Sequence, residues 1–323
     1  MKPLKVNLSG YIPSTVLIPE THILVIGPTG SGKTNTVKVL LEELLKRNIK
    51  VLVLDWHGEY KGLRRYIPGE NLEMNILELG DALKYDPEFI VDLFSHVFLL
   101  SEPQWYLLQR SLREIRPPIK LSTLISAIEE QPVKDWRDYE IKAALLRRLA
   151  ILNEGVMGRV LNGDKPPYFL FEENASVDFS VLPLKYRGLL ALVLLKHLYD
   201  YSVYIRGVAD RIVHVTVIEE AWNIVPYRAR WEPPSIGERL FLELRKFGEQ
   251  VVAVSQRVDD ISERVLRNCQ LILLHSPQAQ DLLKIGLPRE EVERTSLVSK
   301  RGIVYAFCQG GIRKLRVRRA EQL

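Results

Sequence analysis

The 323-residue sequence predicts an α/β fold with a mostly parallel sheet, a helical insertion and a C-terminal β-hairpin. Apolar runs at 22–27, 50–54, 212–218, 250–254 and 271–274 are typical of parallel strands that are covered on both faces. Helical patterns separate several of these runs. The segment from 303 to 318 has the pattern of two strands joined by a Gln309-Gly310-Gly311 turn, which predicts the hairpin.

The predicted strands divide the chain into a core and an insertion. We expect residues 1–60 and 205–323 to form the core and residues 61–204 to form a largely helical insertion within the same domain. Helices are expected after Ser101, which begins a capping box, and at 122–131, 138–153 and 187–201. Residues 169–171 and 177–179 are expected to pair as minor strands, and residues 1–20 to form an irregular lead-in.

Composition narrows the class of protein. Hydrophobic residues make up 46% and charged residues 26% of the chain, as is ordinary for a globular protein with a large core. The net charge of +5 permits a polyanionic partner without requiring one. Cys269 and Cys308 are the only cysteines, so no disulfide framework and no cysteine-based zinc site is expected. No signal peptide or membrane-spanning segment is predicted, and we therefore expect a cytoplasmic protein.

One stretch between the first strand and a helical pattern matches G-x-x-x-x-G-K-[ST] at every fixed position. Backbone N–H groups of such a loop and the following helix N-terminus bind phosphate groups. Lys33 is expected to reach the β- and γ-phosphates, and the Thr34 hydroxyl to bind Mg²⁺. A chance glycine turn is the alternative, and the strand–loop–helix context disfavours it. The expected nucleotide-binding residues are Gly27, Pro28, Thr29, Gly30, Ser31, Gly32, Lys33, Thr34 and Asn35.

The apolar run at 212–218 ends in two acids, Glu219 and Glu220. In phosphate-loop enzymes one such carboxylate binds the hydrated Mg²⁺ and the next polarises the attacking water. We assign Glu219 to the metal and Glu220 to the water. Paired acids after a strand are often plain turn residues, but a phosphate loop upstream makes the catalytic interpretation strong.

A second polar cluster, Asp55-Trp56-His57-Gly58-Glu59-Tyr60, follows the strand at 50–54. Functional side chains gather at the carboxyl ends of parallel strands, so Asp55, His57 and Glu59 are placed where a site is expected. Asp55 and Glu59 are the next candidates for the catalytic base after Glu220. An exposed polar turn is the alternative interpretation.

Two cations and two aromatic residues lie within five positions soon after Glu220: Tyr227, Arg228, Arg230 and Trp231. This mixture suits contact with a nucleic-acid backbone and its adjacent sugars or bases. The alternative is that Trp231 packs on the core while the arginines are solvated. A basic strand face at Lys314, Arg316 and Arg318 either contacts DNA or guards a sheet edge against aggregation.

Together these stretches resemble the HerA/FtsK superfamily of hexameric DNA-pumping ATPases, and the HerA-like branch in particular. The residues that support the resemblance are Gly27 to Thr36, Asp55 to Tyr60, Glu219-Glu220-Ala221-Trp222-Asn223, Arg245-Lys246-Phe247-Gly248 and Ser255-Gln256-Arg257. The resemblance implies a RecA-like (ASCE) phosphate-loop NTPase with an additional strand between the phosphate-loop strand and the acidic strand. It implies that Gln256 senses the γ-phosphate and that Arg245 is a finger for a neighbouring subunit's nucleotide, with Arg239 and Arg257 as rivals.

The same resemblance implies ATP and Mg²⁺ as cofactors, a homo-hexamer, duplex DNA as partner and a nuclease of the NurA type as a further partner. The sequence departs from the family where Trp222 stands in place of a frequent His, and where only about twenty residues precede the first strand instead of an N-terminal barrel. An ATPase of a conjugation- or virus-type DNA-transfer machine and a non-motor nucleotide-dependent assembly switch remain alternatives. A metabolic kinase is disfavoured because no compact acceptor site is evident.

Overall fold

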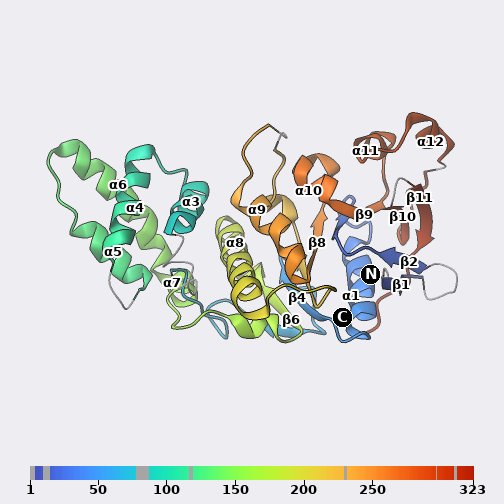
Figure 1. Cartoon of the computed structure of the whole chain (residues 1–323), viewed down its shortest axis with the longest axis horizontal. Helices are drawn as coiled ribbons and strands as arrows, with labels where there is room; N and C mark the ends of the chain where they lie inside the picture. The colour runs from blue at the N-terminus through green and yellow to red at the C-terminus, as the bar shows by residue number, and fades with distance from the viewer. Residues whose placement is uncertain are drawn as a thin grey trace. The chain divides into compact units, whose positions relative to one another are not determined.

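The computed structural model describes residues 4–9, 15–77, 87–115, 119–228, 231–295, 297–308 and 311–323. The chain forms two compact units, and Figure 1 labels many of their elements. The sheet unit comprises Met1–Arg65, Phe169–Ser180 and Ser202–Leu323. The helical unit comprises Tyr66–Tyr168 and Val181–Tyr201. Residues 169–180 therefore return to the sheet unit from within the region expected to be a helical insertion.

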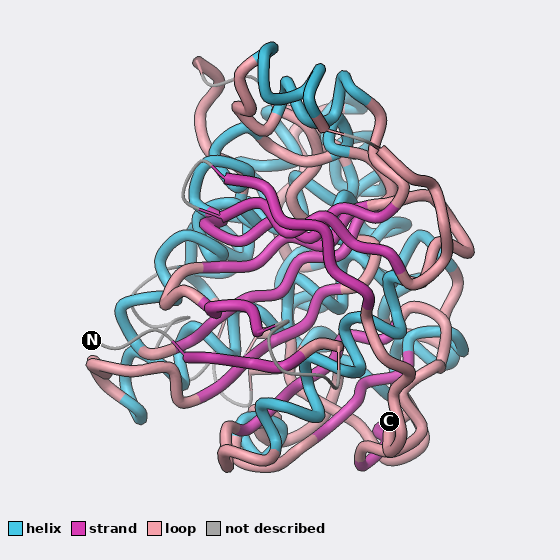
Figure 2. The backbone as a smooth tube through the Cα atoms, turned by 90° about the vertical axis from the view of Figure 1, so that its right-hand side faces the viewer, coloured by secondary structure: helices cyan, strands magenta, loops and turns pink. Residues whose placement is uncertain are grey.

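Nine strands of the described residues form one sheet in the order β11-β10-β9-β3-β8-β7-β4-β6-β5, and Figure 2 shows the strands side by side. The neighbouring pairs from β9 to β6 are parallel, and the pairs that join β9, β10 and β11 are antiparallel. The bounds are β3 His22–Ile26, β4 Lys50–Asp55, β5 Arg64–Tyr66, β6 Ala175–Asp178, β7 His214–Ile218, β8 Glu249–Ser255, β9 Cys269–His275, β10 Ile303–Cys308 and β11 Gly311–Arg316. The predicted α/β fold and C-terminal hairpin are confirmed; the turn residues 309 and 310 lie outside the described residues.

The position of β8 decides the type of α/β fold. β8 pairs with β3 on one side and with β7 on the other, so it lies between the strand before the phosphate loop and the strand before the paired acids. This is the additional strand expected of a RecA-like core. All five residues of β3 and of β7 are buried, as expected for strands covered on both faces.

The predicted pairing of two minor strands at 169–171 and 177–179 is wrong. Tyr168–Phe171 forms a 3-10 turn, η1, instead of a strand. The segment expected at 177–179 is β6, and it pairs in parallel with β4, from Leu52 opposite Ala175 to Asp55 opposite Asp178. A four-residue strand is too short to show its partner in the sequence, since pairing depends on a strand more than a hundred residues away.

The lead-in before β3 is more regular than expected. β1 (Leu4–Asn7) and β2 (Thr15–Ile18) pair antiparallel in a separate two-stranded sheet. Val6 and Ile18 are fully buried in the same cluster as the apolar side chains of β3 and of helix α1 (Lys33–Leu45). The N-terminal segment therefore extends the core on the α1 side.

The helical unit contains α3 Pro87–Phe98, α4 Glu102–Glu114, α5 Leu121–Glu129, α6 Trp136–Leu152, α7 Gly155–Leu161 and α8 Leu184–Asp200. The capping box before α4 is confirmed, because Ser101 N donates to Gln104 Oε1 at 3.1 Å. Helix α6 begins two residues earlier than predicted, because Asp135 accepts hydrogen bonds from the N–H groups of Arg137 and Asp138. The sequence predictions do not include α3 or α7.

Among the residues that the structure describes, one helical stretch, Leu184–Arg206, is long and apolar enough by composition to cross a membrane. It consists of α8 and a π-helical turn at Tyr201–Arg206, and 72% of its most apolar window is buried within the protein. A buried core helix has the same composition, so the stretch is weak support for a membrane span.

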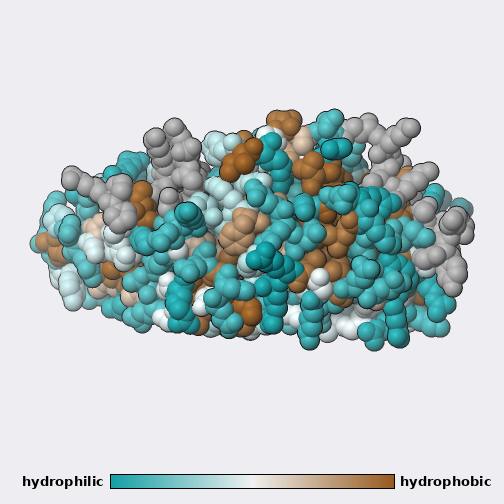
Figure 3. Space-filling view, turned by 90° about the horizontal axis from the view of Figure 1, so that it is seen from below, coloured by the Kyte–Doolittle hydropathy of each residue, from teal (hydrophilic) through white to brown (hydrophobic). Residues whose placement is uncertain are grey.

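The face drawn in Figure 3 is mostly hydrophilic, with hydrophobic side chains in separate small areas.

Candidate functional site

The parallel register brings the predicted functional stretches to one edge of the sheet. Ile26 at the end of β3 lies opposite Ser255 at the end of β8. Ile218 at the end of β7 lies opposite Leu54 in β4. The phosphate loop, the cluster at 55–60, the paired acids and Gln256 follow these ends directly, so the structure brings together stretches that are far apart in the sequence.

The phosphate loop has the geometry of an anion cradle. Gly30 and Gly32 have φ angles of 78° and 103°, which favour glycine. A Cβ atom on Gly27 would lie 2.5 Å from Cβ of His275, so the close approach of β9 also requires glycine there. The N–H groups of Gly30, Gly32 and Thr34 donate to no acceptor among the described residues. These donors at the start of α1 are free to bind phosphate oxygens.

The Lys33 ammonium lies against its own loop, where Nζ donates to the carbonyl oxygens of Gly27 at 2.7 Å and Pro28 at 3.2 Å. Burial lowers the pKa of Lys33, although Glu219, Glu220 and Glu59 act in the opposite direction. A nucleotide phosphate carries more negative charge than a carbonyl oxygen. We therefore expect the β- and γ-phosphates to replace these carbonyl contacts.

Asp55 organises the loop that follows β4. Its Oδ1 accepts hydrogen bonds from the N–H groups of His57 at 3.1 Å and Gly58 at 2.8 Å, and its Oδ2 accepts one from Tyr60 at 3.0 Å. Gly58 has a φ of 72°, and a Cβ there would lie 2.9 Å from Oδ2 of Asp178. The Asp55 carboxylate is 1% exposed and its oxygens are occupied, so this geometry does not favour Asp55 as a catalytic base.

The Asp55 loop in turn positions Glu219. It fixes Tyr60, whose buried hydroxyl donates to Oε1 of Glu219. Burial raises the pKa of Glu219 to about 7. The hydrogen bond from Tyr60 lowers this pKa, whereas the neighbouring acids Asp55, Glu59 and Glu220 raise it.

The predicted metal ligands fit Mg²⁺. Oε2 of Glu219 and the hydroxyl of Thr34 make no hydrogen bond among the described residues, and both are hard oxygen ligands of the kind that Mg²⁺ prefers. A cation beside Glu219 would also favour its ionised form and so oppose the effect of burial. No cluster of three His, Cys, Asp or Glu residues that could hold a metal occurs within the ranges described, so water and phosphate oxygens would supply the other ligands.

Three residues surround the carboxylate of Glu220. Trp222 Nε1 donates to Oε2 at 2.7 Å, and Gln256 Nε2 lies 3.4 Å from both oxygens. His57 Nε2 lies 3.8 Å from Oε1. Gln256 is therefore close to the predicted base, as a γ-phosphate sensor has to be. No sequence signal identifies Trp222 as a partner of Glu220, because the contact depends on an unusual turn between them.

His275 is a site residue to which the sequence analysis gives no role. It ends β9, is 1% exposed, and its Nδ1 lies 3.2 Å from the carbonyl oxygen of Ser31. Burial lowers the pKa of His275 to about 4, so the ring is neutral at pH 7. A neutral ring beneath the phosphate loop supports its shape without adding positive charge. A histidine directly after a buried strand is the only sequence signal for it.

The structure does not place Arg245 at this site. Arg245 is exposed in the 3-10 turn Leu244–Phe247, directly before the amino end of β8. Gln256 follows the opposite end of the same strand. The predicted rival Arg257 is adjacent to Gln256, with an exposed side chain 3.8 Å from Asp259. Arg245 therefore cannot act on the nucleotide of its own chain, and its role toward a neighbouring subunit remains a prediction.

The predicted DNA loop has exposed aromatic side chains and a paired arginine. Trp231 is 87% exposed and Tyr227 is 56% exposed, so the alternative in which Trp231 packs on the core is wrong. Arg228 lies 3.3 Å from Glu232 and 3.9 Å from the buried Glu238. These two carboxylates offset part of the positive charge that Arg228 could present to a ligand. Arg230 lies outside the described residues.

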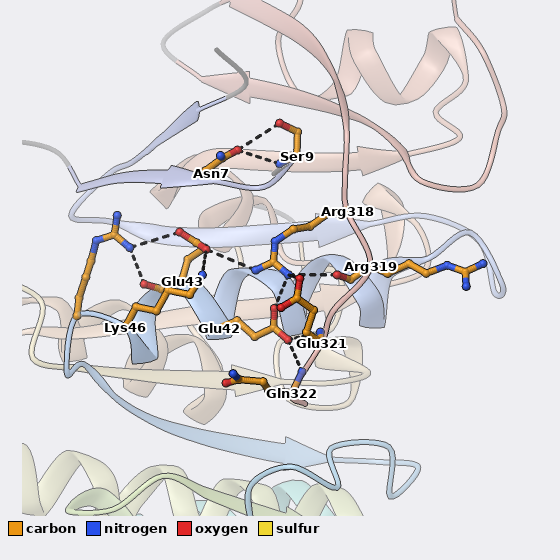
Figure 4. A network of polar contacts seen from close by, with 10 residues as sticks. Asn7, Ser9, Glu42, Glu43, Lys46, Arg318, Arg319, Glu321 and Gln322 are labelled. Atoms are coloured by element: carbon orange, nitrogen blue, oxygen red, sulfur yellow. Dashed lines mark hydrogen bonds and ion pairs between the residues drawn. The ribbon is translucent and has the colours of Figure 1, made fainter. Parts of the chain in front are cut away.

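The C-terminal segment contacts α1, as Figure 4 shows. The Asn35 side chain donates to the carbonyl oxygen of Arg318 at 2.7 Å and accepts from the N–H of Ala320 at 3.1 Å. The Arg318 guanidinium lies 2.6 Å from Glu42 and 3.4 Å from Glu43. Arg318 is thus not part of a basic DNA-facing strand, and the side chain of Asn35 is occupied away from the nucleotide loop. Lys314 and Arg316 are exposed.

Comparison with known proteins finds similarity in sequence and in fold. Residues 16–157 match the family described as "Helicase HerA, central domain". The chain is 24% identical over 274 residues to a probable helicase of Methanocaldococcus jannaschii, and the matched region covers 78% of this chain and 52% of that protein. It is 26% identical over 275 residues to the DNA double-strand break repair helicase HerA of Saccharolobus solfataricus, with 76% and 52% covered. The chain thus spans about half the length of these curated relatives.

Two solved structures share the fold. VirB4 of Thermoanaerobacter pseudethanolicus superposes with a TM-score of 0.72 at 16% identity and covers 98% of this chain and 96% of that chain. The bacterial conjugative coupling protein TrwB superposes with a TM-score of 0.65 at 13% identity, with 99% and 89% covered. At these identities the likeness is one of fold, and it extends over nearly the whole chain.

Proposed function

We propose that this chain is a P-loop ATPase of the HerA/FtsK superfamily and hydrolyses ATP to move duplex DNA as one subunit of a homo-hexameric ring. The observation that carries the proposal is the grouping around Glu220. A carboxylate at the end of β7 lies beside Gln256 at the end of β8 and exerts an electrostatic effect on Lys33 in the phosphate loop. A base, a phosphate sensor and a phosphate-binding cation are the parts that ATP hydrolysis needs.

Each residue has a distinct task in the proposed reaction. The loop N–H groups and Lys33 bind the phosphates and stabilise negative charge on them. Glu219 and Thr34 would hold Mg²⁺, and a bound Mg²⁺ would offset negative charge on the phosphates. Glu220 accepts a proton from the attacking water, and Gln256 is placed to contact the γ-phosphate. Asp55, Tyr60 and His275 shape the site without contacting the nucleotide.

One feature supports a second subunit, and another supports coupling of hydrolysis to DNA. Arg245 lies at the end of β8 opposite to the nucleotide loop, so a catalytic role for it requires a second copy of the chain. The exposed Tyr227 and Trp231 follow Glu220 by few residues, so a change at Glu220 can reach a DNA-contacting loop along a short stretch of chain. Phosphate contacts and aromatic stacking do not depend on the DNA sequence. A motor that moves along DNA requires contacts of this kind.

The experiment that tests the proposal measures ATP hydrolysis with and without duplex DNA, together with displacement of a protein bound to that duplex. We expect DNA to stimulate hydrolysis and ATP to drive displacement, while Glu220→Gln binds ATP and does neither. Electron microscopy with nucleotide and duplex is expected to show a six-fold ring with a central hole. Hydrolysis without DNA stimulation, displacement or a ring would instead indicate a non-motor assembly switch.

A further inference from the structure

The shortest polar contact of the Glu220 carboxylate is made by Trp222, which has no part in binding nucleotide. We propose that Trp222 is a positioning residue that orients the carboxylate of Glu220 toward the attacking water. This inference rests on the proposed function, since it assigns a task toward the base of that same site. The juxtaposition that carries it is an indole N–H held against one oxygen of the base by a local turn.

The backbone around Glu220 creates this contact. Glu220 has φ 47° and ψ 46°, a left-handed conformation that is uncommon for residues other than glycine. Strained backbone at a functional position persists because the surroundings impose it. Here Asn223 imposes it, since its backbone N–H and its side-chain Nδ2 both donate to the carbonyl oxygen of Glu220, at 2.9 Å and 3.0 Å. The resulting 3-10 turn, Ala221–Asn223, brings the side chains of residues 220 and 222 together.

The distances show that the two carboxylate oxygens of Glu220 differ in how closely they are contacted. Trp222 lies 2.7 Å from Oε2, a normal distance for a hydrogen bond to a charged acceptor. Gln256 at 3.4 Å is shared between both oxygens, and His57 at 3.8 Å from Oε1 is beyond hydrogen-bonding distance. Trp222 therefore engages Oε2 and leaves Oε1 able to accept a proton from water.

Packing does not account for Trp222, because its side chain is 44% exposed. A half-exposed indole contributes little to a core, and its N–H, unlike its ring, is directed at a functional group. Trp222 also lies in the segment that leads to the predicted DNA loop, which is called the aromatic loop below because it contains Tyr227 and Trp231. That segment is anchored where Val225 N donates to Ala221 O at 2.9 Å and Ser262 N donates to Val225 O at 3.1 Å. Trp222 thus joins the base to the start of the predicted DNA loop.

The test uses Trp222→Phe, which keeps an aromatic ring and removes the N–H. We expect kcat for ATP hydrolysis to fall about tenfold while KM for ATP and nucleotide affinity stay unchanged, because the base is then without one charge-assisted hydrogen bond. Trp222→His keeps an N–H donor and is expected to recover most of the missing kcat. Trp136→Phe, the same substitution at a 71% exposed site on α6, is the matched control and leaves kcat unchanged.

The outcomes separate this inference from the function on which it rests. An unchanged or increased kcat in Trp222→Phe, in a protein that hydrolyses ATP normally, overturns the positioning role and leaves the proposed function intact. A parallel loss in Trp222→Phe and Trp222→His, with lowered thermal stability in both, also overturns it, because the ring then matters and the N–H does not. Absence of ATP hydrolysis in the parent chain would overturn both proposals.

Discussion

The side-chain amide of Asn35 donates to the carbonyl oxygen of Arg318 at 2.7 Å and joins the C-terminal segment to the helix that begins with Lys33. The same segment contacts α1 again where Glu42 Oε1 accepts the N–H groups of Glu321 and Gln322. The C-terminal segment therefore helps to set the position of the helix N-terminus at which we propose that phosphate binds.

Arg318→Ala is expected to lower the free energy of unfolding by about 1–3 kcal/mol, because Glu42 stays buried and loses its charged partner. The melting temperature measures the loss, and nucleotide affinity is expected to fall with it. Arg319→Ala is the control, since Arg319 is exposed and contributes only its backbone carbonyl to the network in Figure 4. Equal stability of the two variants would remove the C-terminal segment from any role in supporting α1.

Two substitutions at the nucleotide site are expected to separate binding from turnover. Lys33→Ala should weaken ATP binding strongly, because the phosphates lose their cation. Glu220→Gln should bind ATP as the parent does and lose turnover by about 10²–10⁴-fold, because only activation of the water is affected. Isothermal titration and a phosphate-release assay measure the two effects. If Glu220→Gln keeps its turnover, Glu59 becomes the leading candidate for the base.

Arg245→Ala is expected to bind ATP and to be inactive alone. Mixing it with inactive Lys33→Ala subunits should restore part of the activity, because some mixed interfaces then contain an intact Lys33 and a neighbouring Arg245. Fingers that act between subunits contribute about 10³–10⁵ in rate in related chemistry, so the recovery should be measurable. Mixed rings that stay inactive at every ratio would exclude Arg245 and direct the search to Arg239 and Arg257.

The aromatic loop is expected to contact DNA mainly through Trp231 and its neighbouring cations. Trp231→Ala should reduce duplex affinity equally for unrelated sequences, because stacking and phosphate contacts do not read bases. Arg230→Ala should flatten the slope of log K against log salt by about 0.9 for each DNA phosphate that the protein no longer neutralises. Arg228 is a poorer test, since its removal leaves Glu238 buried without this partner. Unchanged binding in both variants would make Lys314 and Arg316 the next candidates.

The amino end of β8 provides a pH-dependent prediction. Burial opposes ionisation of Glu249, but His214 and Arg206 lower its pKa from 4.5 to about 2. A carboxyl group whose pKa is lower in the folded than in the unfolded chain stabilises the fold at pH values above its unfolded pKa. That stabilisation is lost as the pH falls from about 4.5 toward 2. The melting temperature of Glu249→Gln should thus be furthest below that of the parent at about pH 6–7, with the difference shrinking below about pH 4.5. Glu290→Gln, on an exposed helix, is the control.

Local pattern was sufficient for the parts of this protein that depend on neighbouring residues. The phosphate loop, the strand that ends in Glu219 and Glu220, and the capping box at Ser101 were predictable because each is decided within about ten residues. The parallel sheet was predictable as well, because strands buried on both faces are apolar throughout. The prediction of a nucleotide site with its base at Glu220 therefore needs no more than the amino-acid sequence.

Tertiary structure decided which groups meet. Asp55 and Glu220 both lie at the carboxyl end of a buried strand, yet Asp55 has both oxygens occupied by its own loop while Glu220 lies beside Gln256 and Trp222. Contacts of this kind depend on the order of strands and on the left-handed turn at residue 220. Hydrophobic periodicity in the sequence reveals neither of these. The separation of Arg245 from Gln256 was implicit in the sequence, because the predicted strand at 250–254 lies between them. The place of that strand between β3 and β7 was not, since it is fixed by pairing and not by position in the chain.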